Sequence, residues 1–358
     1  MNRRWLCMGE VTRQFEQRLA DFLGVPHVIA VAHGTAALHL ALDALDLRPG
    51  DEVIVPSLTF VATVQAIRMA GATPVFCDVD PGTLNLDLAD ALQRITPRTR
   101  ALVPVHFAGL PCEMDPLLRE MSARGIRVVE DAAHAFGASC HGRKVGTFGD
   151  LTCFSFDAIK HITCGEGGAI ATRDSGLAHR VARCRRLGMD HSLPDAGSTE
   201  MNWPYQVTSH GFRYHMSDIN AAIGLVQLDK LATFLQRKRQ IVERYDIALA
   251  GQAGLEPVAR DPGEACPWAY VVKVTDGRRD ALREHLQRRG VATLIQFVPN
   301  HLQPAFAPFR VKLPVTEGLF QQILSLPLFV EMTDADTDLV IDAVRSFFGV
   351  PVRVPIAC

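Results

Sequence analysis

The chain has 358 residues, of which 48% are hydrophobic and 21% charged, and its formal net charge at pH 7 is -2. This length is enough for two domains with a large core, and the composition is that of an ordinary soluble globular protein. The near-neutral charge argues against nucleic acid or an anionic membrane as a partner, because no basic excess is present to attract phosphate groups.

The cysteine and histidine positions argue against disulfides and against a metal site. The nine cysteines are scattered with no Cys-x-x-Cys pair, and the thirteen histidines show no metal-ligand spacing. The N-terminus lacks an apolar signal region, and no apolar run is long enough to span a membrane. We therefore expect reduced thiols, no metal, no membrane partner and a cytoplasmic location.

Apolar strand-like runs alternate with helical or loop stretches through the first half of the chain. Apolar residues between Val11 and Phe22 recur at helical spacing, which predicts a first amphipathic helix. Strand-like runs follow at residues 27–31, 52–55, 73–77, 101–105, 126–130, 151–156 and 169–172. This alternation predicts an α/β fold with a mainly parallel sheet of about seven strands, covered on both faces.

The first strand-like run ends in a turn that is suited to binding phosphate. Gly34 and Thr35 follow this run, and a helix is expected from Ala36 to Leu45. A turn of this kind presents free backbone N–H groups and a hydroxyl at a helix N-terminus, which favours an anion. Many Gly-Thr turns only cap a helix, however, so the motif alone does not decide between the two functions.

Two later strands end in side chains that suit a flat cationic ring. Phe60 follows the run at 52–55, at the strand end where open α/β sheets bind ligands, and an aromatic ring there can stack on a ligand. Asp131 directly follows the run at 126–130, where a buried carboxylate is costly unless it meets a cation or several donors. A core phenylalanine and a helix-capping aspartate are the simpler alternatives.

The segment from Thr152 to Gly168 carries a single lysine in a polar turn between two strands. Lys160 follows an apolar strand and precedes a Gly-Glu-Gly-Gly sequence. A lysine buried on such a loop can form a Schiff base, because burial favours its neutral, nucleophilic form. A surface lysine after a strand is the alternative, and the presence of Asp131 upstream favours a cofactor site instead.

The pattern Ser-Phe-x-x-x-Lys-x-Ile-Thr-x-Gly-Glu-Gly-Gly, at residues 155–168, resembles the pyridoxal-phosphate (PLP) lysine segment of the DegT/DnrJ/EryC1/StrS family. Its members are fold-type-I aminotransferases, most of which act on nucleotide-linked keto-sugars. The likeness extends from about Trp5 to the C-terminal helix. It implies a large PLP-binding domain at residues 1–235, which holds the seven-stranded sheet, and a smaller C-terminal α/β domain at residues 236–358.

The resemblance also implies a role for each candidate residue of the cofactor site. Lys160 would form the Schiff base with PLP and then carry a proton between substrate and cofactor carbons, as a catalytic residue. Asp131 would keep the ring nitrogen protonated, and His134, three residues on, would lie near the phenolic oxygen of the ring. Phe60 would cover the ring. The cofactor phosphate would be bound by Gly34, Thr35, Ala36 and Ser155.

The segment from Gly211 to Leu228 resembles the family sequence that reaches across a dimer interface. Arg213 stands where the family usually has an asparagine that contacts the partner subunit's cofactor phosphate, and His215 stands where an arginine is usual. The resemblance therefore implies a homodimer with shared active sites. Arg213 is a forked cation suited to phosphate, either that of the cofactor or one on the substrate.

Substrate contacts are expected from two further places. The segment at residues 296–304 resembles the substrate-facing His-Leu-x-Pro sequence of the family, which makes His301 a candidate, and Trp5 would lie near the substrate mouth. A long polar stretch up to about His210 is of the kind that often has a function or contacts a partner. In the C-terminal part we expect a charged helix at 236–249, a strand at 268–274 and helices at 280–289 and 334–348.

The resemblance thus implies a PLP-dependent aminotransferase, with the cofactor alternating between PLP and pyridoxamine phosphate (PMP). The expected donor is L-glutamate, and the expected acceptor is a nucleotide-linked keto-sugar. A PLP- or PMP-dependent sugar dehydratase is an alternative, although histidine replaces the lysine in that branch of the family. Two further alternatives are a cyclitol aminotransferase and a catalytically silent regulatory protein. The presence of Asp131, Ser155 and Lys160 together argues against the silent protein.

Overall fold

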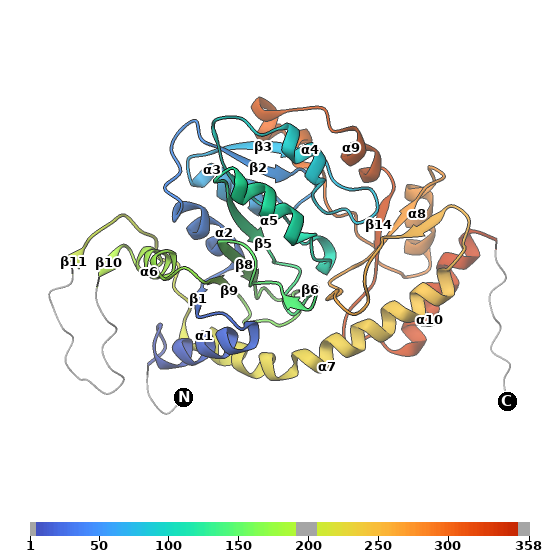
Figure 1. Cartoon of the computed structure of the whole chain (residues 1–358). Coiled ribbons are helices and arrows are strands. Elements are labelled where there is room, and N and C mark those ends of the chain that lie inside the picture. The colour runs from blue at the N-terminus through green and yellow to red at the C-terminus, as the bar shows by residue number, and fades with distance from the viewer. Residues whose placement is uncertain (1–4, 191–205, 350–358) are drawn as a thin grey trace.

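A seven-stranded sheet forms the centre of the molecule (Figure 1). The computed structural model describes residues 5–190 and 206–349. Neighbouring strands are parallel from β3 to β8, whereas β9 is antiparallel to both β8 and β1, so the predicted mainly parallel sheet is confirmed. From one edge to the other the strands are β1 (His27–Val31), β9 (Gly168–Thr172), β8 (Leu151–Ser155), β5 (Arg127–Asp131), β4 (Thr99–Leu102), β2 (Glu52–Pro56) and β3 (Thr73–Cys77).

Helices cover both faces of this sheet, because alternate strand residues point to opposite sides. Ile29 and Val31 of β1 belong to a core shared with α2 (Gly34–Asp43), α3 (Val61–Met69) and α6 (Ser175–Cys184). Val28 and Ala30 belong to a core on the other face, shared with α1 (Glu10–Leu23) and the first part of α7 (Asp218–Leu249). The same face is completed by α4 (Leu88–Gln93) and α5 (Met114–Ala123).

A single helix, α7, connects the sheet to the C-terminal part of the chain (Figure 1). Leu228 and Leu235 pack against α1 and the central sheet, whereas Ile241 and Tyr245 pack in a separate core. The charged helix expected at 236–249 is therefore the second half of a longer helix. The division into domains at residues 235 and 236 stays a prediction, which this change of packing partners along α7 supports.

The separate core lies between a small antiparallel sheet and its helices. The sheet consists of β12 (Leu255–Pro257), β13 (Tyr270–Val274) and β14 (Ile323–Leu326). The helices α8 (Arg279–Arg288) and α10 (Asp334–Phe347) agree with those expected from the sequence. Shorter elements complete this part of the chain: η2 (Asn300–Leu302), η3 (Pro304–Phe309) and α9 (Pro314–Phe320).

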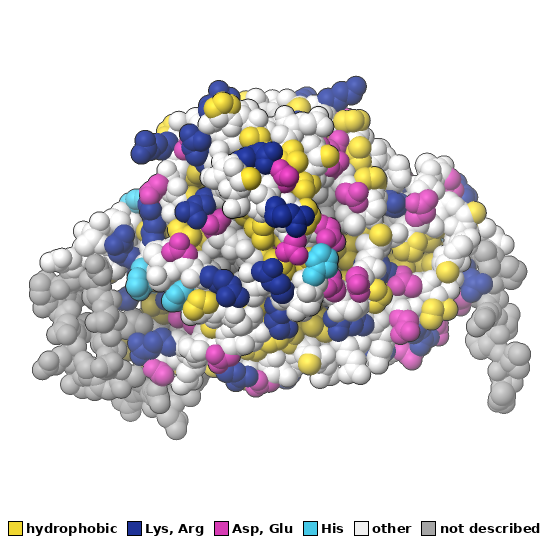
Figure 2. All heavy atoms as spheres, in the orientation of Figure 1, with side chains coloured by type: hydrophobic (Ala, Val, Ile, Leu, Met, Phe, Trp, Pro, Cys, Tyr) yellow, Lys and Arg dark blue, Asp and Glu magenta, His cyan; other side chains and the backbone are white. Residues whose placement is uncertain are grey.

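The polar stretch that was expected to be irregular falls mostly at residues 191–205, outside the described part of the chain. Its flanks form a short antiparallel pair, β10 (Met189–Asp190) and β11 (Gln206–Val207). In the described residues, no helix is both long and apolar enough to cross a membrane. Acidic and basic side chains are interspersed on the face shown in Figure 2, as expected for a chain with a net charge of -2.

Candidate active site

The C-terminal ends of neighbouring strands bring the predicted cofactor residues to one edge of the central sheet. Asp131 is the last residue of β5 and Ser155 the last residue of β8, and these two strands pair in parallel. The β1 strand ends at the same edge and leads into α2 at Gly34, while Phe60 directly precedes α3. The sheet topology thus assembles residues that are far apart in the sequence, as in other open α/β sheets.

The carboxylate of Asp131 is buried, and within the described part of the chain it is hydrogen-bonded to neutral donors alone. The residue is 4% exposed, its Oδ2 accepts a hydrogen bond of 2.7 Å from the Thr63 hydroxyl, and its Oδ1 accepts one of 3.1 Å from the Ala133 amide. A buried carboxylate is most stable beside a cation. A pyridinium N–H would therefore suit Asp131 at this edge of the sheet.

Lys160 lies in the turn between β8 and β9, where it is largely shielded from water. Burial lowers the pKa of its ammonium group, although the negative charges of Asp131 and Asp157 oppose this effect. Its Nζ lies 4.5 Å from the centroid of the Trp268 ring. The lowered pKa favours the neutral amine, which is the nucleophilic form needed to bond a carbonyl carbon.

The His134 imidazole is buried, neutral and incompletely hydrogen-bonded. Burial, together with the charge of Lys160, keeps the pKa of His134 well below its ordinary value. The ring stacks on Trp268 with a centroid distance of 3.7 Å and an interplanar angle of 5°. Its Nδ1 is buried without a partner in the described part of the chain. Such an atom calls for an additional partner, and the phenolic oxygen of a PLP ring would provide one.

The N-terminus of α2 forms a close cradle against Ser155. The Ala36 amide already donates to His33 Nδ1 at 3.0 Å, whereas the Gly34 and Thr35 amides have no acceptor in the described residues. A Cβ atom at Gly34 would lie 2.8 Å from the Cβ of Ser155, so only glycine allows this approach. The two free N–H groups and the serine hydroxyl suit a phosphate group.

Phe60 lies at the rim of the site, and the residue is 54% exposed. The centroid of its ring lies 5.7 Å from that of Phe297, and the Phe297 centroid lies 6.0 Å from that of the His134 ring. The exposed face of Phe60 is thus available to cover a flat ligand. The cofactor fits the residues at this sheet edge, because the chain supplies a carboxylate, an amine, an anion cradle and an aromatic cover.

Two of the predicted residues are exposed, and in the described structure no hydrogen bond joins the side chain of either to Asp131, Lys160 or Ser155. Arg213 is exposed and forms an isolated backbone bridge with Arg186, next to the end of β1. Trp5 is 55% exposed at the start of α1, and its Nε1 donates to the Met8 carbonyl. The roles expected for Arg213 and Trp5 stay predictions, since both need a second subunit or a bound substrate.

His301 is fully buried, so its ring does not present a surface to a substrate in this conformation. Its Nδ1 lies 2.7 Å from the Ser57 hydroxyl, and its Nε2 lies 3.3 Å from Glu317. The neighbouring Asn300 donates a hydrogen bond of 2.7 Å to the Thr59 carbonyl, which is next to Phe60. The substrate contact expected for His301 stays a prediction, and this geometry favours an indirect effect through the Phe60 loop.

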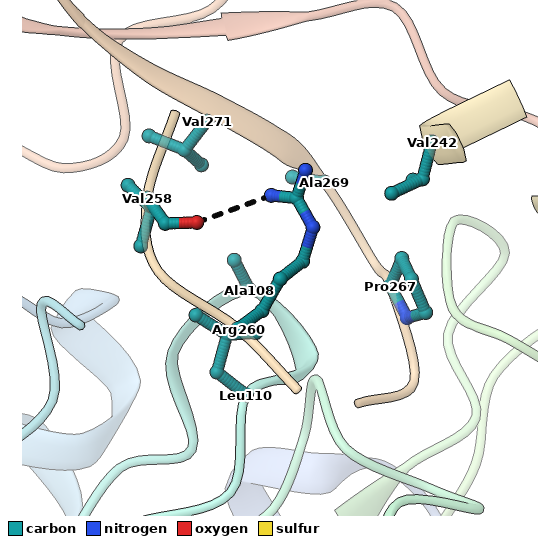
Figure 3. A pocket seen from close by; sticks show the side chains of 8 residues that line it. All are labelled: Ala108, Leu110, Val242, Val258, Arg260, Pro267, Ala269 and Val271. Carbon is teal, nitrogen blue, oxygen red and sulfur yellow. Dashed lines mark hydrogen bonds between the residues drawn. The ribbon is translucent and has the colours of Figure 1, made fainter. Parts of the chain in front are cut away.

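Trp268 and Phe297 belong to the site, but sequence reasoning did not assign either to it. Trp268 was expected in a strand, yet β13 begins only at Tyr270, and the indole turns toward His134. No local sequence pattern could have indicated this contact, because it joins the edge of the central sheet to the segment before β13. Pro267 and Ala269, which flank Trp268 in the sequence, line a small apolar cavity together with Arg260, which donates to the Val258 carbonyl at 3.2 Å (Figure 3).

Comparison with known proteins gives a consistent result. A sequence model of the DegT/DnrJ/EryC1/StrS aminotransferase family matches residues 1–345. The chain is 40% identical to GDP-perosamine synthase of Caulobacter vibrioides over 350 residues, which are 96% of this chain and 92% of that protein. It is 39% identical over 351 residues to the spore coat polysaccharide biosynthesis protein SpsC of Bacillus subtilis, with coverages of 95% and 90%.

Solved structures agree with these sequence matches. The aminotransferase TlmJ of Streptoalloteichus hindustanus superposes with a TM-score of 0.90 at 37% identity, covering 96% of this chain and 92% of that one. A Streptococcus pneumoniae protein of the same fold, 29% identical to this chain, has been solved in both PLP and PMP forms.

Proposed function

Because the chain belongs to the DegT/DnrJ/EryC1/StrS aminotransferase family, we propose that it transfers an amino group from L-glutamate to a nucleotide-linked keto-sugar. The chain is a PLP-dependent aminotransferase. The observation that carries the proposal is that Lys160, with its lowered pKa, and the buried carboxylate of Asp131 lie at the same ligand edge of the sheet. The choice of acceptor is supported by the likeness to GDP-perosamine synthase, whose product is a nucleotide-linked sugar.

When bound, PLP supplies an electron sink that stabilises negative charge at the amino-bearing carbon. Lys160 holds the cofactor and then moves a proton between that carbon and the cofactor carbon, for which its lowered pKa suits it. Asp131 would hold the ring nitrogen in its protonated form, because two opposite unit charges about 4 Å apart attract by on the order of 4 kcal/mol at an effective dielectric of about 20.

The remaining site residues bind and orient the cofactor. His134 is neutral and buried, so its ring nitrogen can form a hydrogen bond with the phenolic oxygen without adding charge. The Gly34 and Thr35 amides and the Ser155 hydroxyl bind the phosphate, while Ala36 supports the cradle through its bond to His33. Phe60 covers the ring and limits the access of water.

The acceptor proposal is tested by product analysis. Incubation of the holoenzyme with L-glutamate and a GDP-linked keto-sugar is expected to yield the corresponding amino-sugar, identified by mass spectrometry, in amounts that match the 2-oxoglutarate formed. A reaction without L-glutamate serves as the control. Loss of water without gain of nitrogen would instead identify a dehydratase, and amination of a free keto-cyclitol alone would identify the cyclitol alternative.

A homodimer with shared sites is also part of the proposal. Three apolar residues, Ile219, Ile223 and Val226, are between 41% and 55% exposed on α7, at a spacing that places them on one side of the helix. The opposite side packs on α1, where Gly224 contacts Phe15. An exposed apolar stripe of this kind suits burial against a second copy of the chain. The start of α7 lies close to Arg213 in the sequence, so this contact would bring Arg213 near the partner.

We expect Arg213→Ala to weaken PLP retention by about tenfold, because a charge-assisted bond to the phosphate is lost across the dimer interface. The measurement is the rate of PLP loss on dialysis, with the exposed Arg173→Ala as a matched control. Unchanged PLP retention with an increased KM for the acceptor would contradict this role and would assign Arg213 to a substrate phosphate.

A cytoplasmic location is proposed as well. Among the described residues all eight cysteines are free thiols, and seven of them are buried. Burial also raises the pKa of thiols such as Cys153 and Cys164, which keeps them unreactive. Free buried thiols are typical of proteins that stay in a reducing compartment.

A further inference from the structure

A short segment before β13 packs directly against the lysine loop. This segment, residues 265–268, is called the strap here. The Cys266 amide donates to the Gly109 carbonyl and the Trp268 amide to the Ala108 carbonyl, each at 3.0 Å. A Cβ atom at Gly109 would lie 1.8 Å from the Cys266 carbonyl oxygen, and its φ is +90°. Glycine at position 109 is thus required for the strap to lie this close to the sheet edge.

The strap holds the lysine loop at one side chain and one backbone carbonyl. The His161 Nε2 lies 2.9 Å from the Cys266 carbonyl, and the Trp268 Nε1–H donates a hydrogen bond of 3.0 Å to the Ile159 carbonyl. These two bonds flank Lys160 on both sides in the sequence. The position of the Lys160 backbone therefore depends on the strap.

Trp268 also contacts the side chains of Lys160 and His134. The Lys160 Nζ lies 4.5 Å from the centroid of the indole, within the range of a cation–π interaction, and the indole stacks on His134. In the described residues, no carboxylate oxygen lies within 4.0 Å of this Nζ. The indole face thus attracts the ammonium form together with the carboxylates of Asp131 and Asp157, which act on it from beyond 4.0 Å.

We propose that Trp268 is a positioning residue whose indole holds the amino group of Lys160 whenever that group is not bonded to the cofactor. In an aminotransferase the lysine amine must leave the cofactor when the substrate nitrogen replaces it, remain close enough to move a proton, and return. The indole face gives the released amine a fixed position beside the cofactor site. The Nε1–H bond to Ile159 keeps the loop in the same place during this exchange.

The indole face also changes the protonation of the free lysine in a definite direction. Burial lowers the pKa of Lys160, whereas the negative charges of Asp131 and Asp157 oppose that effect, and the neighbouring His134 and His161 are neutral. The electron-rich face of the indole adds a further attraction for the charged form. Removing the face is therefore expected to lower the pKa of the free amine by about half a pH unit. The neutral amine would then be available at a lower pH.

The test is the pH dependence of PLP incorporation into the apoenzyme, followed by the visible absorption band. Trp268→Phe keeps an aromatic face, whereas Trp268→Met fills the space without one. We expect the pH midpoint of the incorporation rate to fall by about half a unit in Trp268→Met and to stay near the wild-type value in Trp268→Phe. For Trp268→Met we also expect kcat to fall about tenfold with KM for the donor nearly unchanged, because proton transfer is affected more than binding.

A second measurement leaves the shape of the site unaltered. Biosynthetic replacement of tryptophan by a fluorinated analogue withdraws electron density from the indole and weakens the attraction for the ammonium. Fluorination should lower the pH midpoint of PLP incorporation in the wild-type sequence, compared with the unfluorinated protein. It should leave the midpoint of Trp268→Phe unchanged. Equal midpoints in both fluorinated proteins would overturn the proposal, whether or not Trp268→Met folds. Because PLP incorporation needs no substrate, the result does not depend on the proposed donor or acceptor.

Discussion

Lys160→Ala is expected to abolish the visible absorption band of the lysine-bound cofactor and to reduce amino transfer by at least about 10⁴-fold. The variant loses both the covalent link to PLP and the group that moves the proton, and proton transfer alone is typically responsible for 10²–10⁴-fold. The side chain has no ion-pair partner in the described residues, so its removal should leave the fold intact. The absorbance spectrum after addition of PLP gives the first result, and a turnover assay gives the second.

The control for this variant is Lys273→Ala, which removes a lysine of β13 that pairs with Glu256 away from the sheet edge. It should retain the band and the activity. A band that persists in Lys160→Ala would show that another lysine carries the cofactor. Lys238 would then be the first candidate, because it is buried on α7 and burial lowers its pKa as well.

Asp131→Asn is expected to lower kcat by about 10³-fold while the cofactor still binds. The substitution preserves shape but removes the charge that keeps the ring nitrogen protonated, and a loss on the order of 4 kcal/mol corresponds to about 10³-fold in rate. With the asparagine oxygen facing the Ala133 amide, its NH2 group can donate to the Thr63 hydroxyl, which can in turn donate to the Phe60 carbonyl. The local structure should therefore persist. The spectrum of the bound cofactor and single-turnover rates with the donor provide the readout.

A matched control is Asp150→Asn, which replaces an aspartate just before β8, at the opposite end of the strand. Asp150 bonds Arg127 and the Val128 amide and does not approach the site. Its variant should lose some stability and little activity. Equal losses in kcat for the two variants would contradict the special role of Asp131, because they would point to a general effect of charge or folding.

The sequence predicted the central sheet well because each strand is a short apolar run followed by a polar turn. Asp131 was placed at the ligand edge because it directly follows such a run, and strand ends of parallel sheets meet at one edge. Ser155 was assigned through the resemblance to the family, and in the structure it is the last residue of its strand. The extent of α7 was not predicted. Its two halves contact different cores, so the apolar pattern changes partway along a continuous helix.

The contacts between distant segments were beyond sequence reasoning. Trp268 stacks on His134 and lies over Lys160 only because the strap folds back to the sheet edge. His301 was expected to face a substrate, yet its ring is buried between Ser57 and Glu317. In both cases a side chain's environment depends on tertiary packing, which no local spacing encodes. The contact expected from Arg213 depends on more than the folding of one chain, because it requires a second copy of the chain.

The central claim is that Lys160 and Asp131 form a PLP site that accepts an amino group. The most direct test is the absorbance spectrum of the purified protein with PLP, recorded before and after addition of L-glutamate. A visible band that forms with PLP and bleaches to the amine form of the cofactor after L-glutamate is the predicted result. A band that does not respond to L-glutamate would contradict the proposed donor, and failure to form any band would contradict the assignment of the cofactor site itself.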